Sequence, residues 1–145
     1  MIEDVLLSPY ILAIIAAWLL SHVVKYIIAT IQGKRLDFTH QLFVSGGMPS
    51  SHAATSVAVW MVILLTDGPA SGLFGLATLV VLIVTYDAVK VRRSSGEQGA
   101  AIAQLIKESK SKAVIPRAAK GHTPLEVFVG SVFGALIGAA VYWVI

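Results

Sequence analysis

Four apolar stretches constrain this chain more than any other feature of its sequence. They are Ser8–Ile31, Ala53–Leu65, Leu73–Tyr86 and Val127–Ile145. The hydrocarbon core of a bilayer is about 30 Å thick, and a helix needs about 20 residues to cross it. The first and last stretches meet that length, whereas the two in the middle are short. The pattern predicts an all-α fold, a polytopic membrane bundle of about four transmembrane helices.

Composition supports the same fold class. Of 145 residues, 57% are apolar and 13% are charged, whereas a soluble domain carries about 25% charged residues. An ordinary soluble domain and a disordered chain are therefore both excluded. The chain has no cysteine, which excludes disulfide scaffolds, thiolate zinc sites and cysteine nucleophiles.

We expect a single membrane domain over residues 1–145. Its helices are predicted at approximately 8–31, 50–66, 72–91 and 123–145, with loops at 32–49 and 92–122. Ser8 is the expected N-cap of the first helix, with Pro9 at the first helical position. Within the second loop, Gln98–Ser109 has apolar side chains at helical spacing beside lysines, which predicts a short amphipathic helix on the inner leaflet. A mobile charged loop is the alternative.

The basic residues all fall on one side of this predicted topology. The eleven are Lys25, Lys34, Arg35, Lys90, Arg92, Arg93, Lys107, Lys110, Lys112, Arg117 and Lys120. The other side holds Glu3, Asp4 and Asp67. By the positive-inside rule, both termini lie outside and both long loops are cytoplasmic. We expect an integral protein of a bacterial plasma membrane, and the net charge of +3 needs no nucleic-acid partner.

The first polar motif runs from Ser45 to His52 and leads directly into an apolar helix. Glycines such as Gly47 allow close backbone approach, and a helix start that contains Ser50 and Ser51 offers N–H groups and hydroxyls to an anion. His52 would lie in the first helical turn, where it can donate a proton. The structural alternative is a serine N-cap that follows a glycine turn.

The second motif is Gly121-His122-Thr123-Pro124-Leu125-Glu126. Thr123 and Glu126 have the spacing of a capping box, so Glu126 already has a structural explanation. His122 lies four residues before Glu126, within reach of its carboxylate. A carboxylate against one imidazole nitrogen fixes the tautomer and makes the other nitrogen more nucleophilic. A catalytic pair and a merely structural pair remain equally open.

The third motif, Tyr86–Arg93, follows the third apolar stretch. Asp87 is a candidate functional residue because ionisable groups at membrane depth are costly, and its expected partner is Lys90 or an arginine. Arg92 and Arg93 have the planar fork that grips phosphate, although an arginine pair here also serves as a topology anchor. The three motifs would meet at one cytoplasmic mouth, and their side chains suit phosphoryl transfer through a phosphohistidine.

At this point the sequence resembles a known family. Gly47-Met48-Pro49-Ser50-Ser51-His52 is similar to the Pro-Ser-Gly-His signature of the type 2 phosphatidic acid phosphatase and vanadium haloperoxidase superfamily. Gly121–Val127, followed by Gly130 and Gly134, resembles its last motif. With Tyr86-Asp87-Ala88 and Val91-Arg92-Arg93, the chain looks like the divergent branch described as acid phosphatase/vanadium-dependent haloperoxidase-related.

The resemblance implies a role for each motif residue. His122 would be the nucleophile, Glu126 its orienting carboxylate, and His52 the general acid for the leaving alcohol. The implied phosphate-binding set is Ser50, Ser51, Arg92, Arg93, Lys34, Arg35, Asp87, Gly47 and Gly121. No metal or other cofactor is implied.

The chain also departs from the family pattern. Lys34 and Arg35 stand in for a lysine and a distant Arg-Pro. The position six before His122, an arginine in the family, is Pro116, and Arg117 is one residue off. Glu126 and Ser51 replace aspartate and glycine. The usual bundle has six helices, so a homodimer could complete it, with the glycines at 130, 134 and 138 as a contact ridge; packing within one chain would use that ridge equally well.

These features predict a membrane phosphatase acting on a lipid phosphate or an isoprenoid (di)phosphate at the cytoplasmic face. The alternative is a catalytically degenerate membrane protein that binds anionic lipids or acts as a scaffold. Two further alternatives are weaker: a metal site built from His52, His122, Asp87 and Glu126, and a CDP-alcohol phosphotransferase, which would need further aspartates after Asp87.

Overall fold

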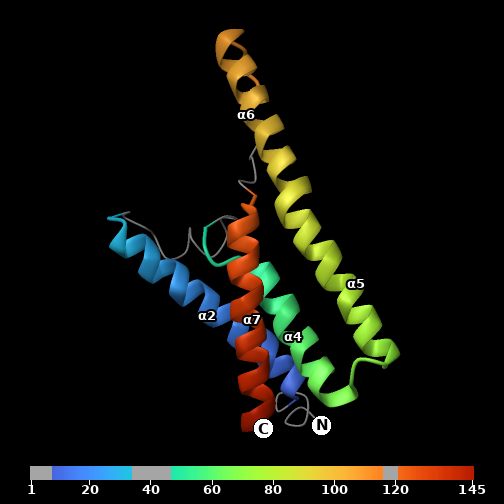
Figure 1. Cartoon of the computed structure of the whole chain (residues 1–145). Coiled ribbons are helices and arrows are strands. Elements are labelled where there is room, and N and C mark those ends of the chain that lie inside the picture. The colour runs from blue at the N-terminus through green and yellow to red at the C-terminus, as the bar shows by residue number, and fades with distance from the viewer. Residues whose placement is uncertain (1–7, 34–46, 116–120) are drawn as a thin grey trace.

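The computed structural model describes residues 8–33, 47–115 and 121–145, and all regular elements in this part of the chain are helices, with no strand (Figure 1). The helices are α2 (Pro9–Ile31), α4 (Ser51–Asp67), α5 (Gly72–Tyr86), α6 (Arg92–Glu108) and α7 (Pro124–Val144), and a π-helical segment, η1 (Asp87–Val91), joins α5 to α6. The predicted all-α membrane bundle is confirmed. Ser8 and Pro9 begin α2 as predicted, although the Ser8 side chain makes no capping hydrogen bond.

Three of the described helices are long and apolar enough to cross a membrane. They are Pro9–Ile31 with 23 residues, the continuous helix Gly72–Glu108 with 37, and Pro124–Val144 with 21. The fourth apolar helix, α4, has 17 residues, or about 26 Å at about 1.5 Å per residue. It approaches the thickness of the hydrocarbon core, as the four-helix prediction requires.

Helix α4 lies at the centre of the bundle and packs against α7, α2 and α5. Its tightest neighbour is α7, whose Gly130, Gly134 and Gly138 face the backbones of Ser50, Ala54 and Ala58. A Cβ added at any of these glycines would overlap that backbone, so only glycine permits this approach. The ridge therefore serves packing within the chain and provides no support for the predicted homodimer.

A second stripe of small residues brings α2 against the bundle. Every fourth residue of α2 is buried, namely Ala13, Ala17, Ser21, Lys25 and Ala29. Ala13 and Ala17 join Ala58, Val62 and Ile137 in one apolar cluster. Lys25 is the one long side chain on this stripe, and it is 7% exposed.

The structure corrects the predicted boundaries of the third helix and the second loop. The chain continues from α5 through η1 into α6 and stays helical to Glu108, where the sequence predicted a loop from 92 with a short helix at 98–109. The segment contains no proline, and its two glycines cost only about 1 kcal/mol each in a helix. Figure 1 shows α6 extending the line of α5 beyond the rest of the bundle rather than turning across it.

Candidate functional site

The N-terminus of α7 positions a histidine against a carboxylate. The Thr123 hydroxyl accepts a hydrogen bond from the Glu126 N–H, and Glu126 Oε2 accepts one from the Thr123 N–H at 3.1 Å, so the predicted capping box is confirmed. The same Oε2 lies 3.1 Å from Nδ1 of His122. The predicted contact between His122 and Glu126 is therefore present, and the capping box fixes the carboxylate that makes it.

His122 is itself held by η1. Its backbone N–H donates to the carbonyl of Ala88 at 3.1 Å. The preceding Gly121 has a φ of +64°, and a Cβ there would lie 2.7 Å from the backbone of Arg93. Gly121 thus has a packing role that holds His122 against η1 and the start of α6; its predicted contact with phosphate remains a prediction.

The environment of His122 favours the neutral imidazole. Burial is the main cause that lowers the pKa of His122 from its ordinary value of 6.5, and the charges of Lys25 and Arg92 lower it further. The hydrogen bond to Glu126 and its charge act in the opposite direction without cancelling this effect. With Nδ1–H donating to Glu126, the lone pair of the neutral ring lies on Nε2. Such a ring can act as a nucleophile or base near neutral pH.

The start of α4 is fastened to the same end of α7. Ser50 is the N-cap of α4, its hydroxyl accepts from the Ala53 N–H, and its own N–H donates to the carbonyl of Glu126 at 3.1 Å. Ser50 is fully buried, so the structural alternative of an N-cap serine holds at this position. Gly47 lies in the exposed turn before it, with a φ of +82° that favours glycine.

Lys25 is a site residue that the sequence analysis did not single out. Its Nζ donates a hydrogen bond of 3.1 Å to Oγ of Ser51, the first residue of α4. The available signal was the four-residue spacing of small residues that ends at Lys25 and Ala29, which places this lysine on the buried face of α2. A lysine on such a face is costly and so marks a candidate functional group.

The two arginines of the third motif point to different partners. Arg92 Nε lies 2.7 Å from Oδ2 of Asp87, which confirms an arginine as the partner of that carboxylate. Arg93 Nε instead lies 3.1 Å from Oε1 of Glu97, one turn along α6, in an exposed pair. The charge of Arg92 acts on both His122 and His52, which places Arg92 at the site, whereas the predicted contact of Arg93 with phosphate remains a prediction.

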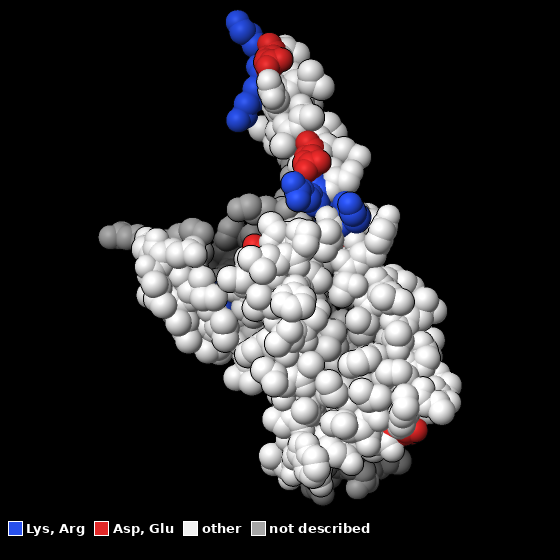
Figure 2. Space-filling model, viewed as in Figure 1, with Lys and Arg blue, Asp and Glu red and all other residues white. Residues whose placement is uncertain are grey.

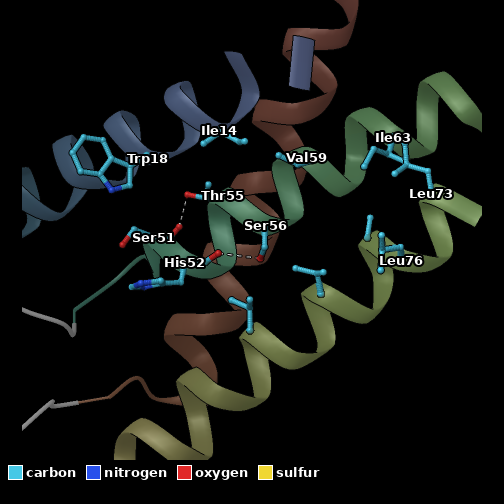
Figure 3. A pocket seen from close by; sticks show the side chains of 13 residues that line it. Ile14, Trp18, Ser51, His52, Thr55, Ser56, Val59, Ile63, Leu73 and Leu76 are labelled. Atoms are coloured by element: carbon cyan, nitrogen blue, oxygen red, sulfur yellow. Dashed lines mark hydrogen bonds between the residues drawn. The ribbon is translucent and has the colours of Figure 1, made fainter. Parts of the chain in front are cut away.

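His52 completes the cluster from the first turn of α4. Its side chain is exposed, and its titratable neighbours are Arg92, His122, Lys25 and Asp87. His52 and Ser51 also line one end of an apolar cavity between α2, α4 and α5 (Figure 3). Two imidazoles, an orienting carboxylate and two cations therefore come together from α2, α4, η1–α6 and α7.

Some predicted site residues cannot be placed in this cluster. Lys34, Arg35 and Arg117 lie outside the described residues. Within the described ranges, no three His, Asp or Glu side chains come close enough together to hold a metal ion. The four residues named for a metal site are instead divided between the His122–Glu126 and Asp87–Arg92 pairs, with His52 beside them.

Comparison with known proteins finds a family whose model covers the three motifs of this site. The model of a family described as the Divergent PAP2 family matches residues 6–137. The chain belongs to the divergent PAP2 family. As a member, it is 33% identical to the "Uncharacterized membrane protein YuiD" of Bacillus subtilis (strain 168), over 87% of this chain and 89% of that protein. No solved structure matches the chain significantly.

Family membership confirms the predicted resemblance, and together with the spanning helices it identifies an integral membrane protein. Membership of the divergent PAP2 family also suggests a role related to phosphatases. The matched region includes all three motifs and both histidines of the cluster.

Proposed function

We propose that this protein is a membrane phosphatase that hydrolyses the phosphate monoester or diphosphate of a lipid through a phosphohistidine at His122. The observation that carries the proposal is the His122–Glu126 pair. The imidazole is buried, neutral near pH 7 and held at Nδ1 by a carboxylate 3.1 Å away. This arrangement suits a nitrogen nucleophile, since the lone pair is on Nε2 and the ring orientation is fixed.

The surrounding cations fit a phosphoryl group. Lys25 from α2 and Arg92 from α6 both act electrostatically on His122. In phosphoryl transfer the protein mainly positions the substrate and stabilises charge on the phosphoryl oxygens. We assign that role to Lys25, Arg92 and the hydroxyl of Ser51, which already bonds to Lys25.

The proposed reaction has two steps. His122 Nε2 attacks phosphorus, a P–N bond forms, and the P–O bond to the lipid alcohol breaks while His52 gives its proton to the departing oxygen. A water molecule then attacks phosphorus, the P–N bond breaks and its electron pair returns to Nε2, and His52 takes a proton from the water. From a monoester the products are inorganic phosphate and the lipid alcohol; from a diphosphate the lipid monophosphate leaves in place of the alcohol. Both histidines return to their starting states.

The proposed location is the cytoplasmic face of a bacterial plasma membrane, with both termini outside. Every described Lys and Arg lies toward the end of the bundle that holds His52 and His122, whereas Asp67 lies at the far end of α4. Figure 2 shows the basic side chains gathered over α6 and its junction with the bundle, above a surface with almost no charge. The positive-inside rule assigns the basic end to the cytoplasm.

The direct test is phosphate release from a panel of lipid phosphates by purified protein, with and without EDTA. We expect turnover that EDTA leaves unchanged and that vanadate inhibits, because vanadate resembles five-coordinate phosphorus. No release from any phosphate ester by folded protein, with retained binding to anionic vesicles, would favour the lipid-binding alternative. EDTA inhibition reversed by one divalent metal would favour a metal site.

The leaving group provides a second arm of this test. His52→Ala should lower the rate toward an alkyl phosphate by about 10²-fold or more, because the alkoxide then leaves without a proton. The same variant should still release a burst of p-nitrophenolate from p-nitrophenyl phosphate, whose phenolate leaves unaided, although the later hydrolysis of the phosphohistidine is slowed. Loss of this burst together with the alkyl phosphate rate would contradict the role of His52 as general acid.

A further inference from the structure

A cavity of about 490 Å³ lies between α2, α4 and α5, and it begins at the catalytic cluster. Its polar end is formed by Ser51 and His52, and the rest of its lining is almost entirely apolar, from Trp18 of α2 to Leu73 and Leu76 of α5 (Figure 3). Its volume is within the range of about 300–1,000 Å³ that is typical of small-molecule sites.

The two hydroxyls on its α4 wall do not make this cavity polar. Thr55 Oγ1 donates to the carbonyl of Ser51 at 2.7 Å, and Ser56 Oγ donates to the carbonyl of His52 at 2.9 Å (Figure 3). Both hydroxyls therefore satisfy their hydrogen bonds within the helix backbone. An occupant meets hydrocarbon along the wall and polar groups only at the His52 end.

The cavity is built into the bundle. The indole N–H of Trp60 donates to the Thr78 hydroxyl at 2.8 Å, and the Trp60 ring lies against Phe74, so α4 and α5 are fastened together beside it. Yet no residue of α5 is buried. Helix α5 is thus fastened to α4 at Trp60 but does not fill the space beside it. The cavity that remains has an apolar lining, which favours an apolar occupant.

The length of the cavity matches one leaflet of a bilayer. Along α4 its lining runs from Ser51 to Ile63, which at about 1.5 Å per residue is about 18 Å. Half of a hydrocarbon core about 30 Å thick is about 15 Å. A chain that enters from the leaflet at the His52 end would reach the bilayer centre along this cavity.

We propose that the cavity holds one hydrocarbon chain of the substrate lipid, with the scissile oxygen beside His52 and the chain directed toward Leu73. This inference rests on the proposed function, because the general acid must stand next to the leaving alcohol, and that alcohol carries the apolar chain. The phosphoryl group then lies between His52 and His122, and the substrate is a lipid of the leaflet on the His52 side.

The test is photolabelling with a hexadecylphosphonate that carries a diazirine near the end of its chain. The P–C bond cannot be hydrolysed, so the readout is independent of turnover. We expect saturable adducts on Ile63, Leu73 and Leu76 that excess unlabelled hexadecylphosphonate removes and hexadecanol does not. Competition by farnesylphosphonate would assign an isoprenyl chain to the site, and competition by the straight chain alone would assign an acyl-type chain.

Two variants of α5 make the test specific. Ala77 lines the cavity, whereas Leu79 is 53% exposed and lies outside the lining. Ala77→Phe should reduce labelling at least fivefold and raise the KM for hexadecyl phosphate about tenfold. Leu79→Phe should change neither quantity.

The outcomes separate this inference from the proposed function. Adducts spread over outward residues such as Leu19 and Leu136, unaffected by Ala77→Phe, would overturn the chain site even if p-nitrophenyl phosphate is hydrolysed. Saturable labelling of the cavity by protein that hydrolyses no phosphate ester would support the chain site and overturn the phosphatase.

Discussion

The Nζ of Lys25 donates a 3.1 Å hydrogen bond to the Oγ of Ser51, which lies 26 positions later in the chain, and both residues are 7% exposed. The contact joins the C-terminal third of a spanning helix to the first residue of α4. It places an amine beside the helix start that leads into His52. We propose that this pair binds the phosphoryl oxygens of the substrate.

Lys25→Met should therefore lower kcat/KM for phosphate esters by about 10²-fold, because a positioned charge on the phosphoryl oxygens is lost. The protein should stay folded, since methionine fills the same space without a buried amine. Lys90→Met is the matched control, because Lys90 is exposed at the same end of the bundle. Phosphate release and detergent-phase thermal unfolding measure the two effects, and equal rates for the two variants would exclude Lys25 from the site.

The neighbouring arginines offer a second matched comparison. Arg92→Ala should raise the KM and lower kcat/KM by about 10-fold or more, because Arg92 is the arginine near both histidines. Arg93→Ala should stay within about twofold of wild type, since Arg93 pairs with Glu97 on the exposed face of α6. Steady-state kinetics of both variants on one lipid phosphate measure the difference. A larger loss of kcat/KM for Arg93→Ala than for Arg92→Ala would show that Arg93 is the arginine of the site.

The pH dependence follows from the lowered pKa of His122. A nucleophile must be unprotonated, so the acid limb of kcat/KM should lie below the ordinary histidine value of 6.5. Glu126 opposes this lowering, so Glu126→Gln should move the limb to still lower pH and reduce the plateau rate at least about 10-fold. Glutamine can keep the helix cap, which makes the variant a test of charge. A limb that moves to higher pH would contradict the assigned role of Glu126.

Packing of α4 on α7 makes a prediction about stability. Gly134→Ala should destabilise the protein by several kcal/mol, because the added Cβ meets the Ala54 backbone. Gly75→Ala, on the open face of α5 with nothing within 4 Å, should be neutral or stabilising by up to about 1 kcal/mol. Thermal unfolding in detergent compares them, and equal midpoints would show that the α4–α7 contact is looser than described.

Sequence predicted the parts of the site that depend on local spacing. His122 and Glu126 are four residues apart at a helix start, and the predicted capping box turns the Glu126 carboxylate back toward His122. Asp87 and Arg92 are five apart on one continuous helix, and an arginine partner was among the predictions. Each of these contacts joins residues only four or five positions apart in the sequence.

The remaining features of the site and the fold depend on packing between helices that are far apart in the sequence. Local spacing does not predict such packing. Lys25 reaches Ser51 only because the small residues of α2 let it approach α4. The loop predicted from residue 92 is helical to Glu108, because polar residues after an apolar stretch mark the membrane boundary and do not end a helix. From the sequence, the glycines of α7 could pack against a second chain or against a helix of the same chain. In the structure they pack against α4.

The most direct test of the central claim is to trap the phosphorylated enzyme. Protein mixed with a phosphate-labelled lipid phosphate and quenched within milliseconds should carry phosphate in an acid-labile, base-stable linkage, and peptide mapping should place it on His122. His122→Ala should show neither the label nor turnover, whereas His52→Ala should still accumulate the label from p-nitrophenyl phosphate. Wild-type turnover by His122→Ala, or label mapped to any other residue, would contradict the account.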